Sequence, residues 1–193
     1  MKLFSKKEFK AILIIFVFLI LVCIPGFRES LMLSRDLQRK NDFWDIYSAL
    51  SAYHEDFGVY PLSQDSKILA CKKPDTEVIN DPIKGYIVDY IPCEWGGGSI
   101  TNVLDESKTP YIKDLPADPQ ADKGLYYVYL SNGTRYQLYA SLESSKQDEF
   151  SLEIKNLNIN CGKRVCNFGR SPGKTPLDKS IEEYENELNE KNK

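Results

Sequence analysis

The feature that most constrains this chain is an unbroken apolar run close to its N-terminus, Ala11–Ile24, with the sequence AILIIFVFLILVCI. Lysines precede the run, and Pro25-Gly26 follows it. As a helix the run is about 21 Å long, and flanking residues extend it to about 28 Å because the side chain of Lys10 can reach the headgroup layer. A bilayer core is about 30 Å thick. We therefore expect an uncleaved, single-pass anchor in the cell membrane.

The apolar run has three alternative interpretations. A cleaved signal peptide needs small residues three and one positions before the cut, and residues 24–31 offer no good pair. A lipoprotein would use Cys23, but Val22 stands where a small residue is expected. A helix buried in a soluble core is the remaining alternative. Lysines before the run favour a cytoplasmic N-terminus and an extracytoplasmic domain, although basic residues also follow the run.

The composition leaves room for the anchor and one domain of modest size. The chain has 193 residues, of which 42% are hydrophobic, and this length is typical of a single core. The formal net charge is −3. Such a value does not indicate a nucleic-acid or acidic-lipid partner for the chain as a whole.

The cysteines indicate an exported domain that is held by disulfides. Of the five cysteines, Cys23 lies in the apolar run and four lie outside it. An even number suits disulfides in an oxidising compartment, and among three pairings we favour the sequence neighbours, Cys71 with Cys93 and Cys161 with Cys166. A zinc site is the alternative, but no Cys-x-x-Cys pair occurs and the only histidine is distant in the sequence. We expect no metal and no cofactor.

A second helical pattern follows the apolar run. Apolar residues recur at spacings of three and four, which predicts one buried helix face; they are Leu37, Phe43, Trp44, Ile46, Tyr47, Leu50, Tyr53 and Phe57. Charged residues, among them Arg39, fill most of the other positions. Gly58 and Pro61 end the pattern. We expect one continuous rod from residue 7 to residue 57, about 75 Å long, whose N-terminal half must be covered by lipid or by copies of itself.

The strongest β signal lies in the second half of the chain. Leu125–Leu130 and Arg135–Leu142 flank Asn132-Gly133, which is the dipeptide most typical of a tight hairpin turn. Phe150–Ile154 predicts a third strand, and Tyr86–Ile91 predicts a further short strand. We expect an α+β fold, in which a long N-terminal helix with a transmembrane first half carries a small antiparallel sheet on its C-terminal half.

These segments divide the chain into five parts. Residues 1–27 form the membrane anchor, residues 28–57 the amphipathic half of the long helix, and residues 58–160 a globular α/β head. Residues 161–177 form a disulfide loop and a linker rich in Gly, Pro and Ser. Residues 178–193 form a charged tail that is either a short helix or disordered, because few of its residues are apolar.

Phe4 and Glu8 precede the apolar run, and Pro25 follows it. This N-terminal pattern resembles that of the type IV pilin and type II secretion pseudopilin family. With Pro25 set on the family's helix-kinking proline, Phe4 falls on the first position of the mature chain and Glu8 falls on the fifth. Residues 58–61 and the LP-x-DP element at residues 115–119 match further parts of the pattern. The resemblance extends from residue 4 to residue 142.

The resemblance implies a pilin-like fold and a non-catalytic subunit of a type IV pilus or a type II secretion-like filament. The partners would be the membrane, other pilin-like subunits and the assembly machinery. The Glu8 carboxylate would pair with the N-terminal amine of a neighbouring subunit, and cleavage would expose Phe4 for methylation. Leu3 departs from the pattern, since the processing peptidase usually requires glycine before the cut.

A second interpretation is a permanently anchored extracytoplasmic binding module that does not polymerise. Its candidate site is a basic tip that would contact the phosphates of DNA, with a solvated basic loop as the alternative. The tip consists of Lys163, Arg164, Arg170 and Lys174. No nucleophile paired with a base and no phosphate-binding loop occurs, so we expect neither catalysis nor a small-molecule substrate.

Two further groups have a simpler explanation than a binding site. Asp118 and Asp122 would suit calcium, but a turn after Pro119 explains them more simply. The tyrosines between residues 126 and 139 would suit a ligand-stacking surface, whereas half-buried positions on strands are a far more common reason for such residues.

Overall fold

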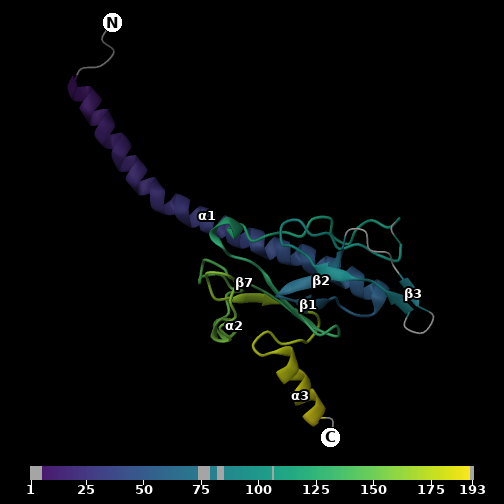
Figure 1. The fold of residues 1–193 in the computed structure, drawn as a ribbon. Coiled ribbons are helices and arrows are strands. Elements are labelled where there is room, and N and C mark those ends of the chain that lie inside the picture. Colours follow the sequence, from purple (N-terminus) through teal and green to yellow (C-terminus); the bar gives the residue numbers. More distant parts are fainter. Residues whose placement is uncertain (1–5, 74–78, 82–84, 106, 192–193) are drawn as a thin grey trace.

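The computed structural model describes residues 6–73, 79–81, 85–105 and 107–191. The protein has an α+β fold that is organised around α1 (Lys6–Phe57), a single helix of 52 residues. At 1.5 Å per residue the helix is about 78 Å long. Figure 1 shows that its N-terminal half projects away from the head and that its C-terminal half runs along the sheets. The predicted continuous rod is confirmed.

The two halves of α1 run in different directions (Figure 1). Pro25 has no backbone N–H to donate within the helix, and the Ser30 hydroxyl donates to the Gly26 carbonyl at 2.9 Å. Both features are known causes of helix bending. The helix ends where Gly58 adopts a left-handed conformation with φ of +72° and its N–H donates to the His54 carbonyl at 2.8 Å, as a glycine after a helix end typically does.

Two three-stranded antiparallel sheets and a two-stranded ribbon accompany α1. One sheet has the order β1-β2-β5 and the other the order β6-β7-β8, while β3 and β4 form the ribbon. The strands are β1 (Leu62–Gln64), β2 (Lys67–Lys72), β3 (Ile79–Asp81), β4 (Gly85–Ile87), β5 (Tyr90–Pro92), β6 (Val128–Ser131), β7 (Tyr136–Ala140) and β8 (Phe168–Arg170). The shorter helices are η1 (Ala121–Lys123), α2 (Leu152–Asn156) and α3 (Ile181–Lys191).

The predicted tyrosine-rich hairpin is confirmed as β6 and β7. Val128 pairs with Tyr139, and Ser131 pairs with Tyr136. In the turn, Gly133 has a φ of +91°, and the Asn132 side-chain oxygen accepts the N–H groups of Thr134 and Arg135. A side chain that replaces backbone hydrogen bonds in this way stabilises the turn.

The expectation of one sheet is corrected to two neighbouring sheets. The β1–β2 hairpin turns through Asp65 and Ser66, whose φ values are +51° and +62°, and such a turn carries no Asn-Gly signature. The Tyr129 N–H of β6 donates to the Ser66 carbonyl at 2.9 Å. The short strand expected at Tyr86–Ile91 is divided between the ends of β4 and β5.

The prediction of a third strand at Phe150–Ile154 is wrong, because α2 begins within this segment, at Leu152. The Ser151 hydroxyl accepts the Ile154 N–H at 3.1 Å and so caps the helix. The third strand of the hairpin sheet is instead β8, in which Phe168 pairs with Ala140. A segment that was assigned to a linker therefore completes the sheet.

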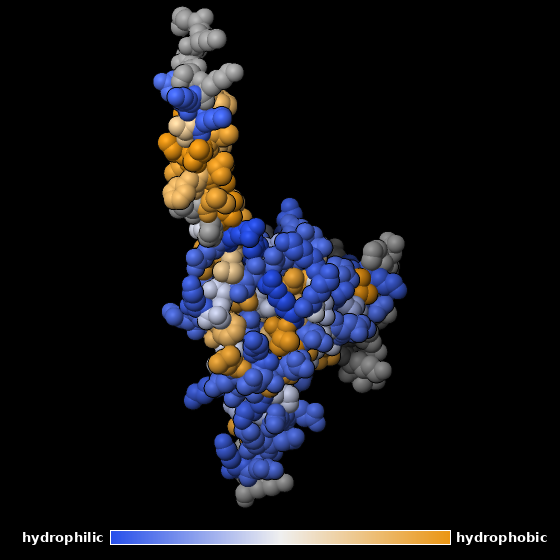
Figure 2. Space-filling model, turned by 90° about the vertical axis from the view of Figure 1, so that its left-hand side faces the viewer, coloured by the Kyte–Doolittle hydropathy of each residue, from blue (hydrophilic) through white to orange (hydrophobic). Residues whose placement is uncertain are grey.

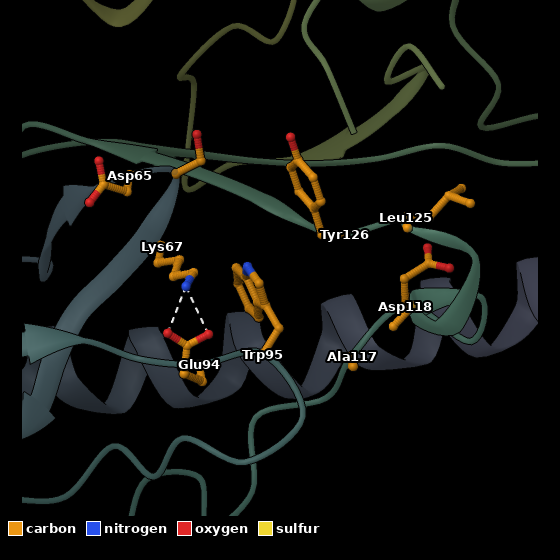
Figure 3. A pocket seen from close by; sticks show the side chains of 11 residues that line it. Asp65, Lys67, Glu94, Trp95, Ala117, Asp118, Leu125 and Tyr126 are labelled. Carbon is orange, nitrogen blue, oxygen red and sulfur yellow. Dashed lines mark hydrogen bonds and ion pairs between the residues drawn. The ribbon is translucent and has the colours of Figure 1, made fainter. Parts of the chain in front are cut away.

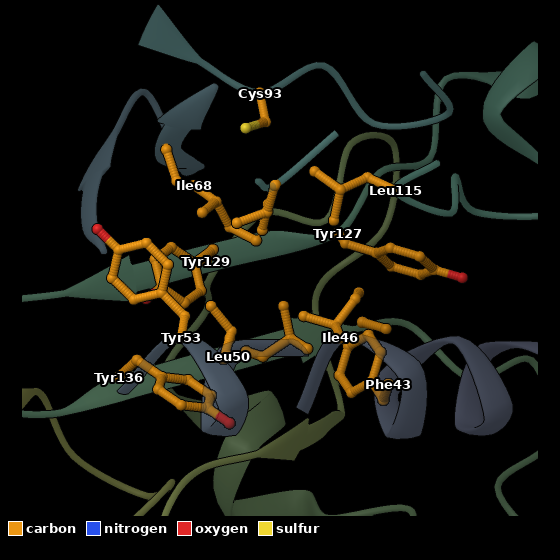
Figure 4. Close-up of a cluster of buried hydrophobic side chains, with 14 of the residues drawn as sticks. Phe43, Ile46, Leu50, Tyr53, Ile68, Cys93, Leu115, Tyr127, Tyr129 and Tyr136 are labelled. Atoms are coloured by element: carbon orange, nitrogen blue, oxygen red, sulfur yellow. The ribbon is translucent and has the colours of Figure 1, made fainter. Parts of the chain in front are cut away.

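The core lies between α1 and the two sheets (Figure 4). Phe43, Ile46 and Leu50 of α1 are fully buried, and they pack in one cluster with residues of both sheets. The buried members from the rest of the chain include Ile68, Cys93, Leu115, Tyr127, Tyr129, Tyr136 and Leu138. Leu37 and Trp44 depart from the predicted buried face, since 55% and 53% of their surfaces are exposed.

Both favoured disulfides are present. Cys71 is joined to Cys93 and Cys161 to Cys166, at sequence separations of 22 and 5 residues. The first links β2 to the end of β5, and the second closes the loop that leads back to β8. Each disulfide thus closes an internal loop of the head, and stabilising a core of modest size is a common function of disulfides in exported domains.

Of the two states expected for the charged tail, the structure shows the helix, α3. The Gln137 side chain, only 1% exposed, donates to the carbonyls of Pro176 and Lys179 at 2.6 and 2.7 Å. The Asn132 amide of the hairpin turn donates to Glu185 of α3 at 2.9 Å. These polar contacts, together with the buried side chain of Ile181, attach the segment to the head.

Candidate functional site

The projecting half of α1 is the most exposed apolar surface of the molecule. In the 18-residue stretch of α1 that best matches a membrane span, no residue is buried. Phe9, Ile14 and Phe18 each expose more than 60% of their surface. Figure 2 shows these residues as an apolar stem that stands out from a largely hydrophilic head. By length and composition, α1 is able to cross a membrane.

The three residues that the resemblance singles out lie at this end of the chain. Glu8 lies in the first turn of α1, where a carboxylate is favoured by the helix dipole. Pro25 lies within α1, near the end of the apolar stem. Phe4 lies outside the described residues.

A buried ionic cluster joins α1 to the head at the base of the stem. Arg39 is fully buried, and its guanidinium donates to both carboxylate oxygens of Asp118 at 2.8 and 2.9 Å. It also donates to Asp36 at 2.9 Å, Glu143 at 3.1 Å and Gln120 at 3.2 Å. Burial alone would lower the pKa of Arg39, but the bonds to these carboxylates outweigh it and raise the pKa.

Neighbouring groups complete the cluster. Arg35 donates to both oxygens of Glu143 at 2.6 and 2.8 Å. Asp36 accepts the backbone N–H groups of Glu143 and Ser144 at 2.8 and 2.9 Å. Burial opposes ionisation of Glu143, but the hydrogen bonds from Arg35 and Arg39 outweigh this effect and lower its pKa. The cluster fixes the angle between helix and head, because paired buried charges tolerate little displacement.

This cluster was not predicted from the sequence. Arg39 was placed among the charged residues outside the apolar stripe, and Asp118 was explained by a turn. The partners of Arg39 in the head lie 79 and 104 residues away in the chain, so no local pattern connects them. Asp42, close by in α1, is 91% buried and accepts the Tyr127 hydroxyl at 2.5 Å. Burial raises the pKa of Asp42, against the effect of this hydrogen bond.

Two members of the predicted basic tip have intramolecular partners. The Arg170 guanidinium lies over the Trp44 ring at 3.7 Å from its centroid, a close cation–π contact. An Arg164 nitrogen lies 3.9 Å from a Glu143 carboxylate oxygen. Lys174 is exposed, and the Lys163 N–H donates to the Gly124 carbonyl at 3.1 Å.

A cavity of about 350 Å³ opens on the head next to the ionic cluster. Figure 3 shows Trp95 and Tyr126 close together in its centre, with the Lys67–Glu94 ion pair on one side and Asp118 on the other. Lys67 contacts both Glu94 oxygens at 2.7 Å. The cavity is formed by the β1–β2 turn, the loop after β5 and the loop around η1. No sequence pattern predicts this cavity, because its lining residues come from separate loops.

The tyrosines do not form an exposed stacking surface. Tyr127, Tyr129, Tyr136 and Tyr139 are buried, whereas 42% of the Tyr126 surface is exposed, at the cavity. His54 stacks on Tyr60 with ring centroids 4.4 Å apart. Among the residues that the structure describes, no group of three or more His, Cys, Asp or Glu side chains is arranged to hold a metal ion.

Comparisons with protein-family models, curated proteins and solved structures find no match to this chain. The resemblance to pilins therefore depends on the residues Phe4, Glu8 and Pro25 and on the motifs that follow them.

Proposed function

We propose that this protein is a non-catalytic, pilin-like subunit, anchored in the membrane by the stem of α1 and carrying an extracytoplasmic head. The observation that supports the proposal best is the division of a single helix into two halves. The N-terminal half is exposed throughout the membrane-length window, while the C-terminal half provides Phe43, Ile46 and Leu50 to the core of the head.

The apolar stem requires a cover. Burying one large apolar side chain such as Phe18 is favourable by about 1.5–3 kcal/mol, and the stem presents a long series of such residues. Lipid tails provide the first cover. In a filament, the stems of neighbouring copies would replace lipid, with dispersion packing in place of lipid contacts. Glu8 would then be paired with the N-terminal amine of the next copy.

The junction between stem and head suits a subunit that is moved as one body. Arg39 binds Asp118 and Glu143 of the head, and Lys146 of the head contacts Glu29 of α1 at 3.2 Å. A displacement of the helix along its axis would therefore carry the head with it. The lysines before the stem favour a cytoplasmic N-terminus and hence a head on the outer side, where its disulfides would persist.

Membrane anchoring is tested with two matched apolar-to-lysine variants. Phe18 on the stem and Leu152 on the head are 66% and 64% exposed. A lysine at the centre of a membrane span costs about 2.5–3.5 kcal/mol, so Phe18→Lys should increase the carbonate-extractable fraction of the full-length protein. Leu152→Lys should leave this fraction unchanged. Recovery of the wild-type chain as a freely soluble monomer without detergent would contradict the proposal.

Assembly is tested through Cys23, the one cysteine outside the two disulfides. Thiol cross-linking in cells should give covalent dimers if stems pack together, and Cys23→Ala should abolish them. Glu8→Ala should reduce the dimer yield, whereas Glu153→Ala, on the exposed surface of the head, should not. Intact-mass measurement adds a second readout, because loss of three residues with gain of a methyl group indicates processing at Phe4.

A permanently anchored binding module is the second candidate. It is favoured by the cavity beside Trp95 and Tyr126, since a purely structural subunit has no need of one. A protein that is retained in the membrane at full length, with no stem cross-links, would support this candidate. The basic tip supports it less, because Arg164 and Arg170 contact Glu143 and Trp44.

A further inference from the structure

The cavity beside Trp95 has polar groups that are not used by the fold. Within the described part of the chain, no hydrogen bond engages the Trp95 indole N–H, the Ser66 hydroxyl or the Tyr126 hydroxyl. Figure 3 shows the Trp95 nitrogen turned towards the space between Lys67 and Tyr126. These groups are therefore available to a ligand.

Two aromatic rings give the cavity an apolar surface of defined position. The Trp95 ring packs edge-on against buried Tyr127, with centroids 5.7 Å apart, so the indole is held by the core. Tyr126 exposes 42% of its surface at the cavity. Both rings can contact the flat C–H face of a small ligand, and the Trp95 ring, which the core already holds, would lose little side-chain entropy on binding.

The walls of the cavity are held by the fold. The Asp65–Ser66 turn is fixed by pairing of β1 with β2 and by the Tyr129 N–H, which binds the Ser66 carbonyl. Asp118 is held by both arms of the Arg39 guanidinium. The site is thus largely formed before a ligand arrives, as binding sites usually are.

The charges in the cavity restrict the chemistry of the ligand. Lys67 is paired with Glu94, and Asp118 is paired with Arg39, while Asp65 adds a further carboxylate to the lining. A phosphate or sulfate would meet more carboxylates than ammonium groups and would be repelled. A lipid tail would leave the polar groups without partners, which is costly.

We infer that this cavity is a subsite for one neutral sugar unit of a glycan. A pyranose presents a C–H face for Trp95 and Tyr126 and a ring of hydroxyl groups for Ser66, Lys67 and Glu94. The volume of about 350 Å³ lies at the lower end of the range for small-ligand sites, about 300–1,000 Å³, and so suits one or two sugar units. The inference does not depend on whether the protein polymerises.

The test uses tryptophan fluorescence of the full-length protein in nanodiscs made from lipids without sugar headgroups. The chain has two tryptophans, so Trp44→Phe leaves Trp95 as the only reporter. Methyl glucoside, methyl galactoside and N-acetylglucosamine are titrated as single probes. At least one should change the emission saturably with a dissociation constant in the millimolar range, which is typical of a small, weakly buried ligand.

Substitutions in the Trp44→Phe background locate the site. Tyr126→Ala should weaken binding about 2- to 10-fold, the range expected for loss of one aromatic contact. Tyr184→Ala, which removes a tyrosine of the tail, should have no effect. In the presence of Trp44, Trp95→Phe should reduce the saturation transfer to the sugar that NMR measures, and an unchanged melting temperature would exclude unfolding as the cause.

Three outcomes would overturn the inference. They are the absence of saturable binding by all three sugars, sugar binding that Tyr126→Ala leaves unchanged, and binding of choline chloride in place of sugars. The last result would indicate an aromatic site for cations. None of these outcomes bears on membrane anchoring, which is measured by extraction.

Discussion

Arg39 of α1 and Asp118 of the η1 loop form a fully buried bidentate ion pair, with nitrogen–oxygen distances of 2.8 and 2.9 Å. The same Asp118 carboxylate accepts the Gln120 N–H at 2.8 Å and lines the cavity beside Trp95. One ion pair thus connects the base of the apolar stem to the candidate ligand site. The head and its cavity are positioned by the C-terminal half of α1.

Replacing Arg39 should strongly destabilise the head. Arg39→Met removes the partner of carboxylates that are themselves buried, and breaking such a pair costs about 3–5 kcal/mol. The free energy of unfolding, followed by near-ultraviolet circular dichroism during urea titration in detergent, measures this loss. Lys40→Met is the matched control, because Lys40 pairs at the surface with Glu149 and such pairs contribute at most about 1 kcal/mol. Equal effects of the two variants would contradict a structural role for the cluster.

Glu143 should give the head a specific sensitivity to acid. Its pKa in the folded protein is lowered from an ordinary value of 4.5, so the unfolded chain binds more protons in this range and stability falls as pH decreases. Its contribution is present above this value and is lost as the pH falls below it. At neutral pH, Glu143→Gln should have a lower free energy of unfolding than the wild type. As the pH falls below 4.5, the variant should lose less of this free energy than the wild type does.

The measurement for Glu143 is a series of thermal unfolding curves at several pH values for both proteins. Asp42 has a raised pKa and therefore contributes a trend of the opposite sign, which is common to both proteins and cancels in their difference. A constant difference in stability between Glu143→Gln and the wild type at all pH values would show that Glu143 does not titrate in this way.

The elements with strong local signals were predictable. The apolar run and the spacing of apolar residues by three and four predicted α1. The dipeptide Asn132-Gly133 predicted the β6–β7 hairpin. The assignment of Leu37 and Trp44 to the buried face was wrong for a geometric reason. A step of six residues from Leu37 to Phe43 rotates by about 240° around the helix, and the step from Phe43 to Trp44 rotates by about 100°. Neither residue shares the face of Phe43.

The elements that depend on distant partners were not predictable. FSLEI at residues 150–154 alternates as a strand does, but the cap formed by Ser151 turns it into α2. Strand β8 lies in a segment rich in Gly and Ser, and its pairing with β7 is visible only once the chain has folded back. The Arg39 cluster and the cavity combine residues from separate loops. Charged residues on an amphipathic helix are usually solvent-exposed, so the sequence favoured the wrong environment for Arg39.

The two disulfides should differ in their effect on stability. The entropy of loop closure increases with the length of the closed loop, which gives about 3 kcal/mol for the separation of Cys71 and Cys93 and about 2 kcal/mol for that of Cys161 and Cys166. Double Cys→Ala variants of each pair, compared by thermal unfolding in detergent, test this order. A larger loss for the pair Cys161 and Cys166 would indicate that packing around these two fully buried residues outweighs loop entropy.

The neighbourhood of the first disulfide contains a position that accepts only glycine. A Cβ atom on Gly98 would lie 2.9 Å from the Cys93 Cβ and 3.0 Å from the Glu94 carbonyl oxygen. Gly98→Ala should therefore destabilise the head by about 1–3 kcal/mol, as overpacking does. Gly97→Ala is the control, because a Cβ atom there meets no atom within 4 Å. Similar melting temperatures for the two variants would contradict this close contact.

Gln137 should control the attachment of the C-terminal tail. Its amide nitrogen donates to the Pro176 and Lys179 carbonyls, which precede α3, and Gln137→Leu would leave both carbonyls without this partner. Since the tail is attached by few apolar contacts, we expect faster hydrogen exchange in residues 176–191 and faster proteolysis there, with little change in the exchange of α1. Lys179→Ala is the control, because it removes only a surface pair with Glu187 and keeps the Gln137 bonds. Unchanged exchange in Gln137→Leu would show that the contacts of Asn132 with Glu185 are sufficient to hold the tail.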